Sequence, residues 1–124
     1  MSKPFSIASR LRSFIYAYKG ITFALSTQHN LIIHVCLALI AILLGFFLNI
    51  SSLEWVSIII VIGIVLTSEL INTALELLVD IISPEINKTA GIVKDIAAGA
   101  VLISAIAALI TGIIIFLPKI IKLL

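Results

Sequence analysis

Three long apolar runs constrain the fold of this chain more than any other feature. They cover residues 31–49, 53–82 and 89–117, and each is long enough to cross the roughly 30 Å of hydrocarbon in a bilayer. With 62% hydrophobic and 11% charged residues, the 124-residue chain has the composition of a membrane protein. We therefore predict an all-α membrane protein, a single domain of residues 1–124, with three transmembrane helices.

An amphipathic segment, residues 5–26, precedes the apolar runs. Its large apolar residues cluster on one side at helical spacing, whereas serines, Arg12 and Gly20 lie opposite. This pattern predicts a helix that lies on the membrane surface rather than crossing it. Tyr16 falls on the polar side of that helix, where an interfacial tyrosine is the simplest interpretation. A polar break over residues 26–30 is expected to separate this helix from the first span.

The basic residues predict the orientation of the spans. Of the eight Lys and Arg residues, only Lys119 and Lys122 lie on the far side of the three spans. Because basic residues favour the cytosolic side, the N-terminus and the 83–94 loop should be cytosolic. A net charge of +2, without a basic run interleaved with aromatic residues, indicates no nucleic-acid partner. The bilayer itself is the expected environment.

Polar residues concentrate in the segment from Glu69 to Asp95, which contains five of the six acidic residues. Four polar side chains of this segment form a stripe on one helix face, within roughly 80° of one another and about 16 Å long: Glu69, Asn72, Glu76 and Asp80. An ionised carboxylate near the bilayer centre costs a few kcal/mol, so three of them indicate function more than packing. An interhelical hydrogen-bonded seam is the structural alternative.

Other features are interpreted as structural. His34 lies near the end of the first span, and we interpret it as a satisfied or interfacial histidine rather than a proton relay. Small residues recur every four positions in the third span, a spacing that favours close helix packing: Ala100, Ser104, Ala108 and Gly112. Pro118 is expected to close the third span at the interface.

The residue types of the acidic segment fit phosphoryl transfer at a membrane surface. The sequence contains no glycine-rich phosphate loop, no zinc-type Cys/His spacing and no nucleophile elbow. Carboxylates suit Mg²⁺, which completes its shell with water and phosphate oxygens, and a lysine such as Lys94 suits a phosphate. A partly desolvated carboxylate near like charges suits a general base.

Two motifs make the chain resemble a known family: Glu-Leu-x-Asn-Thr-Ala-x-Glu followed by Val-Asp, and Lys-Asp-x-Ala-Ala-Gly-Ala-Val. The chain resembles the small bacterial integral-membrane diacylglycerol kinase and undecaprenol kinase family. The resemblance extends from Tyr-Lys-Gly near the start, through His-Asn-x-x-x-His, to Phe-Leu-Pro-Lys at the end. It implies a homotrimer in the bacterial inner membrane, with active sites between subunits, ATP as co-substrate and Mg²⁺ as cofactor.

The resemblance also implies roles for individual residues. Glu69 resembles the general base that takes the proton from the lipid hydroxyl, and Glu76 resembles the carboxylate that holds the divalent ion. Gln28 stands where the family usually has a second metal-binding Glu, so weaker metal binding, an altered metal preference or reduced activity is expected. The positions similar to nucleotide contacts are Tyr16, Asn72, Asp80, Glu85, Asn87, Lys94 and Asp95.

The function that the resemblance implies is ATP-dependent phosphorylation of a membrane lipid alcohol. Residues 97–101 and 116–119 look more like the undecaprenol kinase branch than the diacylglycerol kinase branch, so undecaprenol is the favoured substrate and diacylglycerol the alternative. Two further alternatives are a cation or proton conduit and a structural oligomer; both predict no nucleotide binding. Against the conduit, the second span from Val56 to Leu66 offers no polar path.

Overall fold

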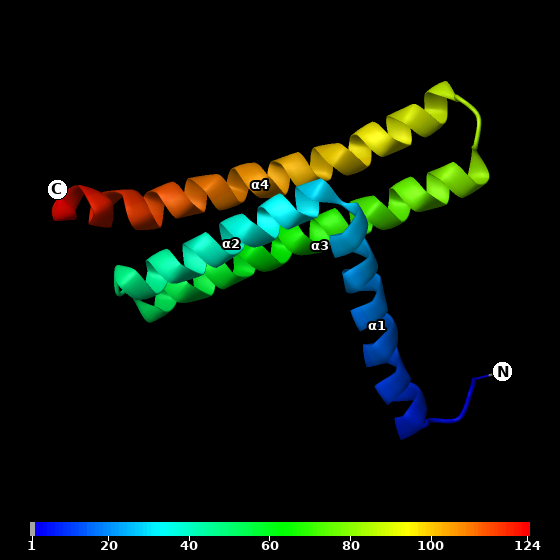
Figure 1. Cartoon of the computed structure of the whole chain (residues 1–124), viewed down its shortest axis with the longest axis horizontal. Helices are drawn as coiled ribbons and strands as arrows, with labels where there is room; N and C mark the ends of the chain where they lie inside the picture. Colours follow the sequence, from blue (N-terminus) through cyan, green and yellow to red (C-terminus); the bar gives the residue numbers. More distant parts are fainter. Residues whose placement is uncertain (1) are drawn as a thin grey trace.

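The computed structural model describes residues 2–124, and all of its regular structure is helical (Figure 1). The α-helices follow one another in the order α1 (Ile7–Thr27), α2 (His29–Phe47), α3 (Ser52–Ile82) and α4 (Lys88–Leu123). Helices α2, α3 and α4 are each long and apolar enough to cross a membrane. The predicted all-α fold, an N-terminal helix followed by three spans, is confirmed.

The three spans form a bundle in which each helix runs antiparallel to the next (Figure 1). Within the single chain they bury few side chains: between 11% and 28% of the most apolar stretch of each span is buried. Soluble proteins rarely expose so large an apolar surface to water. In a bilayer, each helix satisfies its own backbone hydrogen bonds, and the outward side chains face lipid or neighbouring subunits. The chain is a membrane protein.

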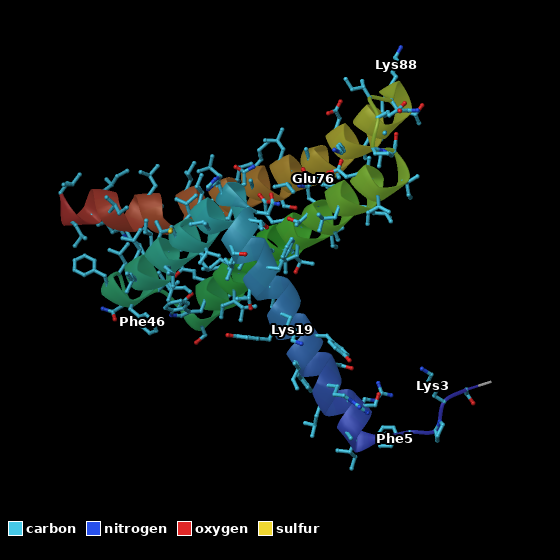
Figure 2. All side chains as sticks on the ribbon, turned by 45° about the vertical axis from the view of Figure 1, so that its right-hand side comes forward. Lys3, Phe5, Lys19, Phe46, Glu76 and Lys88 are labelled. Atoms are coloured by element: carbon cyan, nitrogen blue, oxygen red, sulfur yellow. The ribbon has the colours of Figure 1, made fainter. Side chains whose placement is uncertain are left out.

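Helices α3 and α4 extend well beyond α2 at one end of the bundle. The 19 residues of α2 rise about 28 Å, whereas the 31 residues of α3 rise about 46 Å. Figure 2 shows Lys88 at the end where α3 meets α4, far from Phe46 at the end where α2 meets α3. The second half of the acidic segment therefore lies on a part of the α3–α4 pair that α2 does not cover.

The loop between α3 and α4 is set by local side-chain chemistry. The N–H of Ser83 donates to the carbonyl of Val79 and ends α3 just before Pro84, as expected because a residue before proline avoids helical backbone angles. Asn87 then starts α4: its Oδ1 accepts hydrogen bonds from two backbone N–H groups in the first turn. The loop is therefore short, and α3 and α4 pack closely along their length.

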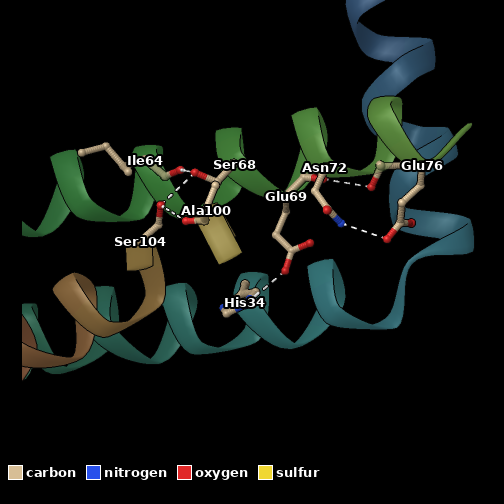
Figure 3. Close-up of polar contacts among 9 residues, drawn as sticks. His34, Ile64, Ser68, Glu69, Asn72, Glu76, Ala100 and Ser104 are labelled. Atoms are coloured by element: carbon tan, nitrogen blue, oxygen red, sulfur yellow. Dashed lines mark hydrogen bonds and ion pairs between the residues drawn. The ribbon is translucent and has the colours of Figure 1, made fainter. Parts of the chain in front are cut away.

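A hydroxyl pair links α3 and α4 in the middle of the bundle. The Oγ atoms of Ser68 and Ser104 lie 2.9 Å apart, and each hydroxyl also reaches the carbonyl one turn earlier in its own helix (Figure 3). At any moment one hydroxyl can donate across the interface while the other donates within its helix. Ser104 belongs to the small-residue ridge of α4, so part of that ridge contacts α3, whereas Ala108 and Gly112 line a groove described below.

The turn between α2 and α3 is fixed at three points. Asn49 adopts a left-handed backbone conformation with φ of 50°, which asparagine tolerates better than most residues. Ser51 and Glu54 form a reciprocal capping box at the start of α3. A carboxylate oxygen of Glu54 also lies 3.3 Å from Nζ of Lys119 near the end of α4. The ion pair thus joins the C-terminal part of α4 to the start of α3, next to the α2–α3 turn.

Pro118 does not end α4, although we expected it to close the third span at Leu117. The helix continues through Pro118 to Leu123. A proline removes one backbone donor, a loss that membrane helices tolerate near their ends because neighbouring groups and water compensate for it. The ion pair between Lys119 and Glu54 holds the turn that follows the proline against the neighbouring helix.

The contact between α2 and α3 next to their turn is unusually close. Gly45 is buried, and a Cβ atom built on it would lie 2.7 Å and 2.9 Å from two ring carbons of Trp55. The Trp55 ring also packs against Phe46, with ring centroids 4.8 Å apart. Only a glycine leaves room for the indole at this position.

We expect Gly45→Ala to destabilise the bundle by about 1–3 kcal/mol, the usual cost of overpacking a tight contact. Trp55 is the only tryptophan, so its fluorescence reports the displacement directly. The matched control is Gly63→Ala on α3, where an added Cβ meets no atom within 4 Å. Thermal unfolding in detergent micelles compares the two variants; equal midpoints and unchanged emission in both would contradict this packing.

Helix α1 points away from the bundle and joins α2 through one residue (Figure 1). Ser6 caps its start by accepting from the N–H of Ser9, and among its residues only Ala24 is buried. The exposed side includes large apolar residues of the predicted lipid-facing stripe, such as Leu11 and Phe14. The predicted break over residues 26–30 is shorter than expected: Gln28 alone is extended, with φ of −111° and ψ of 106°.

Candidate functional site

The acidic stripe of α3 begins where α2 begins and continues onto the uncovered part of the α3–α4 pair. Its members have different surroundings, because each lies at a different depth along α3. Glu69 is buried, Asn72 and Glu76 are half-buried, and Asp80 is exposed. The stripe thus leads from the interior of the bundle toward the surface within three helical turns.

Glu69 is the most enclosed ionisable group of the stripe, with 3% of its surface exposed. Its Oε1 lies 3.2 Å from Nε2 of His34 on α2 (Figure 3). The N–H of the imidazole is poorly aligned with this oxygen, and within residues 2–124 Oε1 of Glu69 accepts no well-aligned hydrogen bond. A buried carboxylate oxygen without a donor is costly, so this atom is available to a donor that the chain itself does not supply.

Asn72 and Glu76, one turn apart on α3, form a second pair. Nδ2 of Asn72 donates to Oε1 of Glu76 over 3.2 Å (Figure 3). The Oδ1 atom of Asn72 is buried and accepts no hydrogen bond from the described part of the chain. The pair therefore presents one carboxylate and one unused amide oxygen, both hard oxygen donors.

Asp80 and Lys94 connect the outer part of the stripe to α4. Nζ of Lys94 lies 2.5 Å from Oδ1 of Asp80, and the two side chains are 40% and 63% exposed. An ion pair this exposed contributes little to stability. Lys94 can therefore exchange this carboxylate for a phosphate group at small cost.

The remaining predicted site residues lie at the edges of this region, on three different elements. Tyr16 is exposed on α1, and Gln28 is half-buried at the α1–α2 junction, where its side chain does not cap α2. Asn87 is engaged as the cap of α4 through Oδ1, which leaves its amide N–H groups free to donate. Glu85 and Asp95 are exposed, and across residues 2–124 neither carboxylate forms an ion pair.

The contact between His34 and Glu69 was not predicted from the sequence. Our interpretation of His34 as a satisfied or interfacial histidine did not connect it with the stripe. A usable signal exists: counted outward from the α2–α3 turn near Asn49, His34 and Glu69 lie about one helical turn apart in height on neighbouring antiparallel helices. Two polar side chains at similar depth in apolar spans are candidates for pairing.

An apolar groove of about 590 Å³ runs from this contact along the bundle. Its walls come from α2, α3 and α4, and His34 is the one titratable residue among those that line it. At the His34 end lie Leu66 and Ala105, and at the far end lie Leu44 and Ile120. The groove is suited to an apolar chain whose polar end lies near Glu69.

The described residues do not form a ready metal centre. Within residues 2–124, no three His, Cys, Asp or Glu side chains gather closely enough to hold an ion. Any ion here would therefore depend on amide oxygens, water or a substrate's oxygens in addition to a carboxylate.

The fold and this site together define a class: a small helical membrane protein with a stripe of ionisable groups that leads from the interior of its bundle to the surface. Comparison with known proteins narrows that class. Residues 15–116 match the family described as prokaryotic diacylglycerol kinase. The chain therefore belongs to the prokaryotic diacylglycerol kinase family, and it is a lipid kinase, an enzyme that uses ATP.

Individual relatives carry two related names. Over 108 residues the chain is 39% identical to an undecaprenol kinase of Bacillus subtilis, covering 87% of this chain and 88% of that one. It is 37% identical over 115 residues to a diacylglycerol kinase of Synechocystis, covering 92% of this chain but 66% of the longer relative. A diacylglycerol kinase of Escherichia coli is 30% identical over 96 residues, 77% of this chain and 79% of that one.

Proposed function

We propose that this chain transfers the γ-phosphoryl group of ATP to undecaprenol, with Glu69 as general base. The observation that carries the proposal is the buried Oε1 of Glu69, which lacks a well-aligned donor and lies at the end of an apolar groove. A lipid hydroxyl entering from the groove would donate the missing hydrogen bond. A base within hydrogen-bond reach of the proton that it removes is the geometry that general base catalysis requires.

The reaction is an in-line displacement. The hydroxyl oxygen forms a bond to the γ-phosphorus while its proton passes to Glu69, and the bond from the γ-phosphorus to the bridging oxygen breaks as ADP leaves with the electron pair. Most of the rate comes from positioning and from neutralising charge. Lys94, released from its exposed pair with Asp80, supplies a positive charge to the phosphates.

The residues of the stripe fit a magnesium ion. Glu76 offers a carboxylate, Asn72 offers a buried oxygen without a donor, and Gln28 adds a neutral amide oxygen. Mg²⁺ binds few protein oxygens and keeps water and phosphate oxygens in its shell. Bound there, it would neutralise part of the phosphate charge. Tyr16, Glu85, Asn87 and Asp95 are proposed as further nucleotide contacts together with Asn72, Asp80 and Lys94.

Undecaprenol is favoured over diacylglycerol for a physical reason as well as by relatives. Apart from His34, the groove is lined by apolar residues. A polyprenyl chain has no polar atoms beyond its hydroxyl, whereas the ester carbonyls of diacylglycerol would lie in the groove without donors, at a cost. The 39% identical relative named undecaprenol kinase supports the same choice.

Transfer of labelled γ-phosphate in mixed micelles tests the proposal. Undecaprenol and diacylglycerol are offered separately with ATP and Mg²⁺, and we expect label in undecaprenol at a rate well above that in diacylglycerol. Label in diacylglycerol alone would reverse the choice of substrate. Absence of label in both lipids, from folded protein, would contradict the proposed reaction.

The assembly and the orientation are part of the same proposal. We place residues 1–124, as one lipid kinase domain, in the bacterial inner membrane with the N-terminus and the active site on the cytosolic side, because most basic residues lie at that end. We propose a homotrimer, as the resemblance to this family implies, because the spans of the single chain leave most of their apolar surface unburied. Crosslinking in membranes reads the subunit number, and thiol labelling of Lys88→Cys in sealed vesicles reads the orientation.

A further inference from the structure

His34 contacts the proposed base and also lines the groove. Its Nε2 lies 3.2 Å from Oε1 of Glu69, and its side chain is 21% exposed while that of Glu69 is 4% exposed. The same residue lines the groove, whereas Glu69 does not. The imidazole therefore lies beside the carboxylate (Figure 3) and also at the wall of the groove.

Glu69 has few other constraints on its carboxylate. Thr73, its neighbour one turn later, donates to the backbone carbonyl of Glu69 rather than to the side chain. Within residues 2–124, His34 is the one ion-pair partner of this carboxylate. Packing confines the buried Glu69 side chain, but of the staggered conformations open to a glutamate only some point the carboxylate at the substrate.

We propose that His34 is a positioning residue that holds Glu69 in its catalytic orientation, an inference that rests on the proposed role of Glu69 as general base. With its proton on Nε2, the imidazole lies 3.2 Å from Oε1 and needs only a change in the direction of its N–H to donate to that oxygen, which would fix the direction of the carboxylate. An ionised carboxylate has about four lone-pair sites, so enough acceptor capacity remains to take the proton of the lipid hydroxyl. His34 itself exchanges no proton with the substrate.

Two substitutions separate this role from simple packing. His34→Leu fills the space at the groove with an apolar side chain and removes the donor. We expect kcat to fall by about 10²-fold, the effect of displacing a reacting group by about an ångström, while the KM for ATP and the thermal unfolding midpoint stay close to wild type. His34→Gln can bring its amide N–H near the place of Nε2, and we expect it to recover most of the lost kcat. A packing role predicts the opposite ranking, with Leu at least as good as Gln.

A third substitution keeps the test decisive if His34→Leu does not fold. His34→Asn is polar and similar in size to Gln, but its amide is one methylene shorter and does not reach Oε1. We expect its kcat to fall like that of His34→Leu. Equal rates for the Gln and Asn variants, or a folded Leu variant with wild-type kcat, would overturn the inference.

Coupling to Glu69 gives an independent readout. In Glu69→Asp, the carboxylate withdraws from His34 by one methylene, so the contact is already lost. If His34 acts through Glu69, His34→Leu should cost much less in this background than in wild type, because coupled residues are non-additive. Fully additive losses would contradict the coupling. Normal turnover by Glu69→Gln would instead show that Glu69 is not the base. That result would refute the proposed function, whereas the His34 variants test only the positioning role.

Discussion

Glu69→Gln should lower the rate of phosphoryl transfer by about 10²–10⁴-fold, the range that a general base contributes. The amide has the shape of the carboxylate but cannot accept the proton. Since Asn72 and Glu76 lie elsewhere on the stripe and Lys94 lies on α4, binding of ATP should remain close to wild type. Label transfer to lipid in mixed micelles gives the rate, and equilibrium binding of ATP gives the affinity.

The control for this experiment is Glu54→Gln. Glu54 lies on the same helix but at the opposite end of the bundle, where it pairs with Lys119. The control removes a carboxylate from α3 without touching the stripe, so its rate should stay near wild type. Normal turnover by Glu69→Gln would exclude Glu69 as the base, and loss of ATP binding in that variant would assign it to the nucleotide site instead.

Glu76→Gln should raise the Mg²⁺ concentration needed for half-maximal activity by at least the 10- to 100-fold that follows loss of an outer-shell partner. The substitution removes the charge, yet its amide oxygen can still accept the hydrogen bond from Asn72. The defect should therefore be one of metal binding rather than of folding. Rates measured across a range of free Mg²⁺ at saturating ATP give the shift.

Gln28→Glu is the reciprocal change. It adds a carboxylate at the α1–α2 junction, and we expect it to lower the Mg²⁺ requirement and to recover part of the loss in Glu76→Gln. Magnesium curves that do not move in either variant would remove both residues from the metal site. A shift in Glu76→Gln alone would assign the ion to Glu76 without Gln28.

The helices could be predicted from sequence because the bilayer leaves few choices. A span in hydrocarbon must satisfy every backbone group internally, so an apolar run of sufficient length is a helix. Local exceptions were harder to predict. Pro118 lies inside α4, and Lys119 just beyond it contacts Glu54 of α3; that contact joins residues 65 positions apart in sequence.

The candidate site, like the fold, could be predicted from the sequence only in part. Helical spacing alone placed Glu69, Asn72 and Glu76 on one face of α3, because these residues share one helix. The partner of Glu69 was not predictable from spacing, since its distance from His34 depends on how α2 packs beside α3. The close contact of Gly45 with Trp55 contributes to that packing. The spacing of residues along the sequence does not indicate this contact.

The groove that runs from His34 has a consequence for how the enzyme meets its substrate. Moving a lipid from the membrane to water costs about 0.8 kcal/mol for each buried CH₂ group, so a long polyprenyl chain is effectively insoluble. Because the groove lies within the spans, the lipid tail stays in hydrocarbon, and the enzyme does not have to transfer it to water. The reaction should then obey two-dimensional kinetics: its rate follows the mole fraction of lipid alcohol in the membrane and falls on surface dilution with inert lipid, even when the bulk concentration is unchanged.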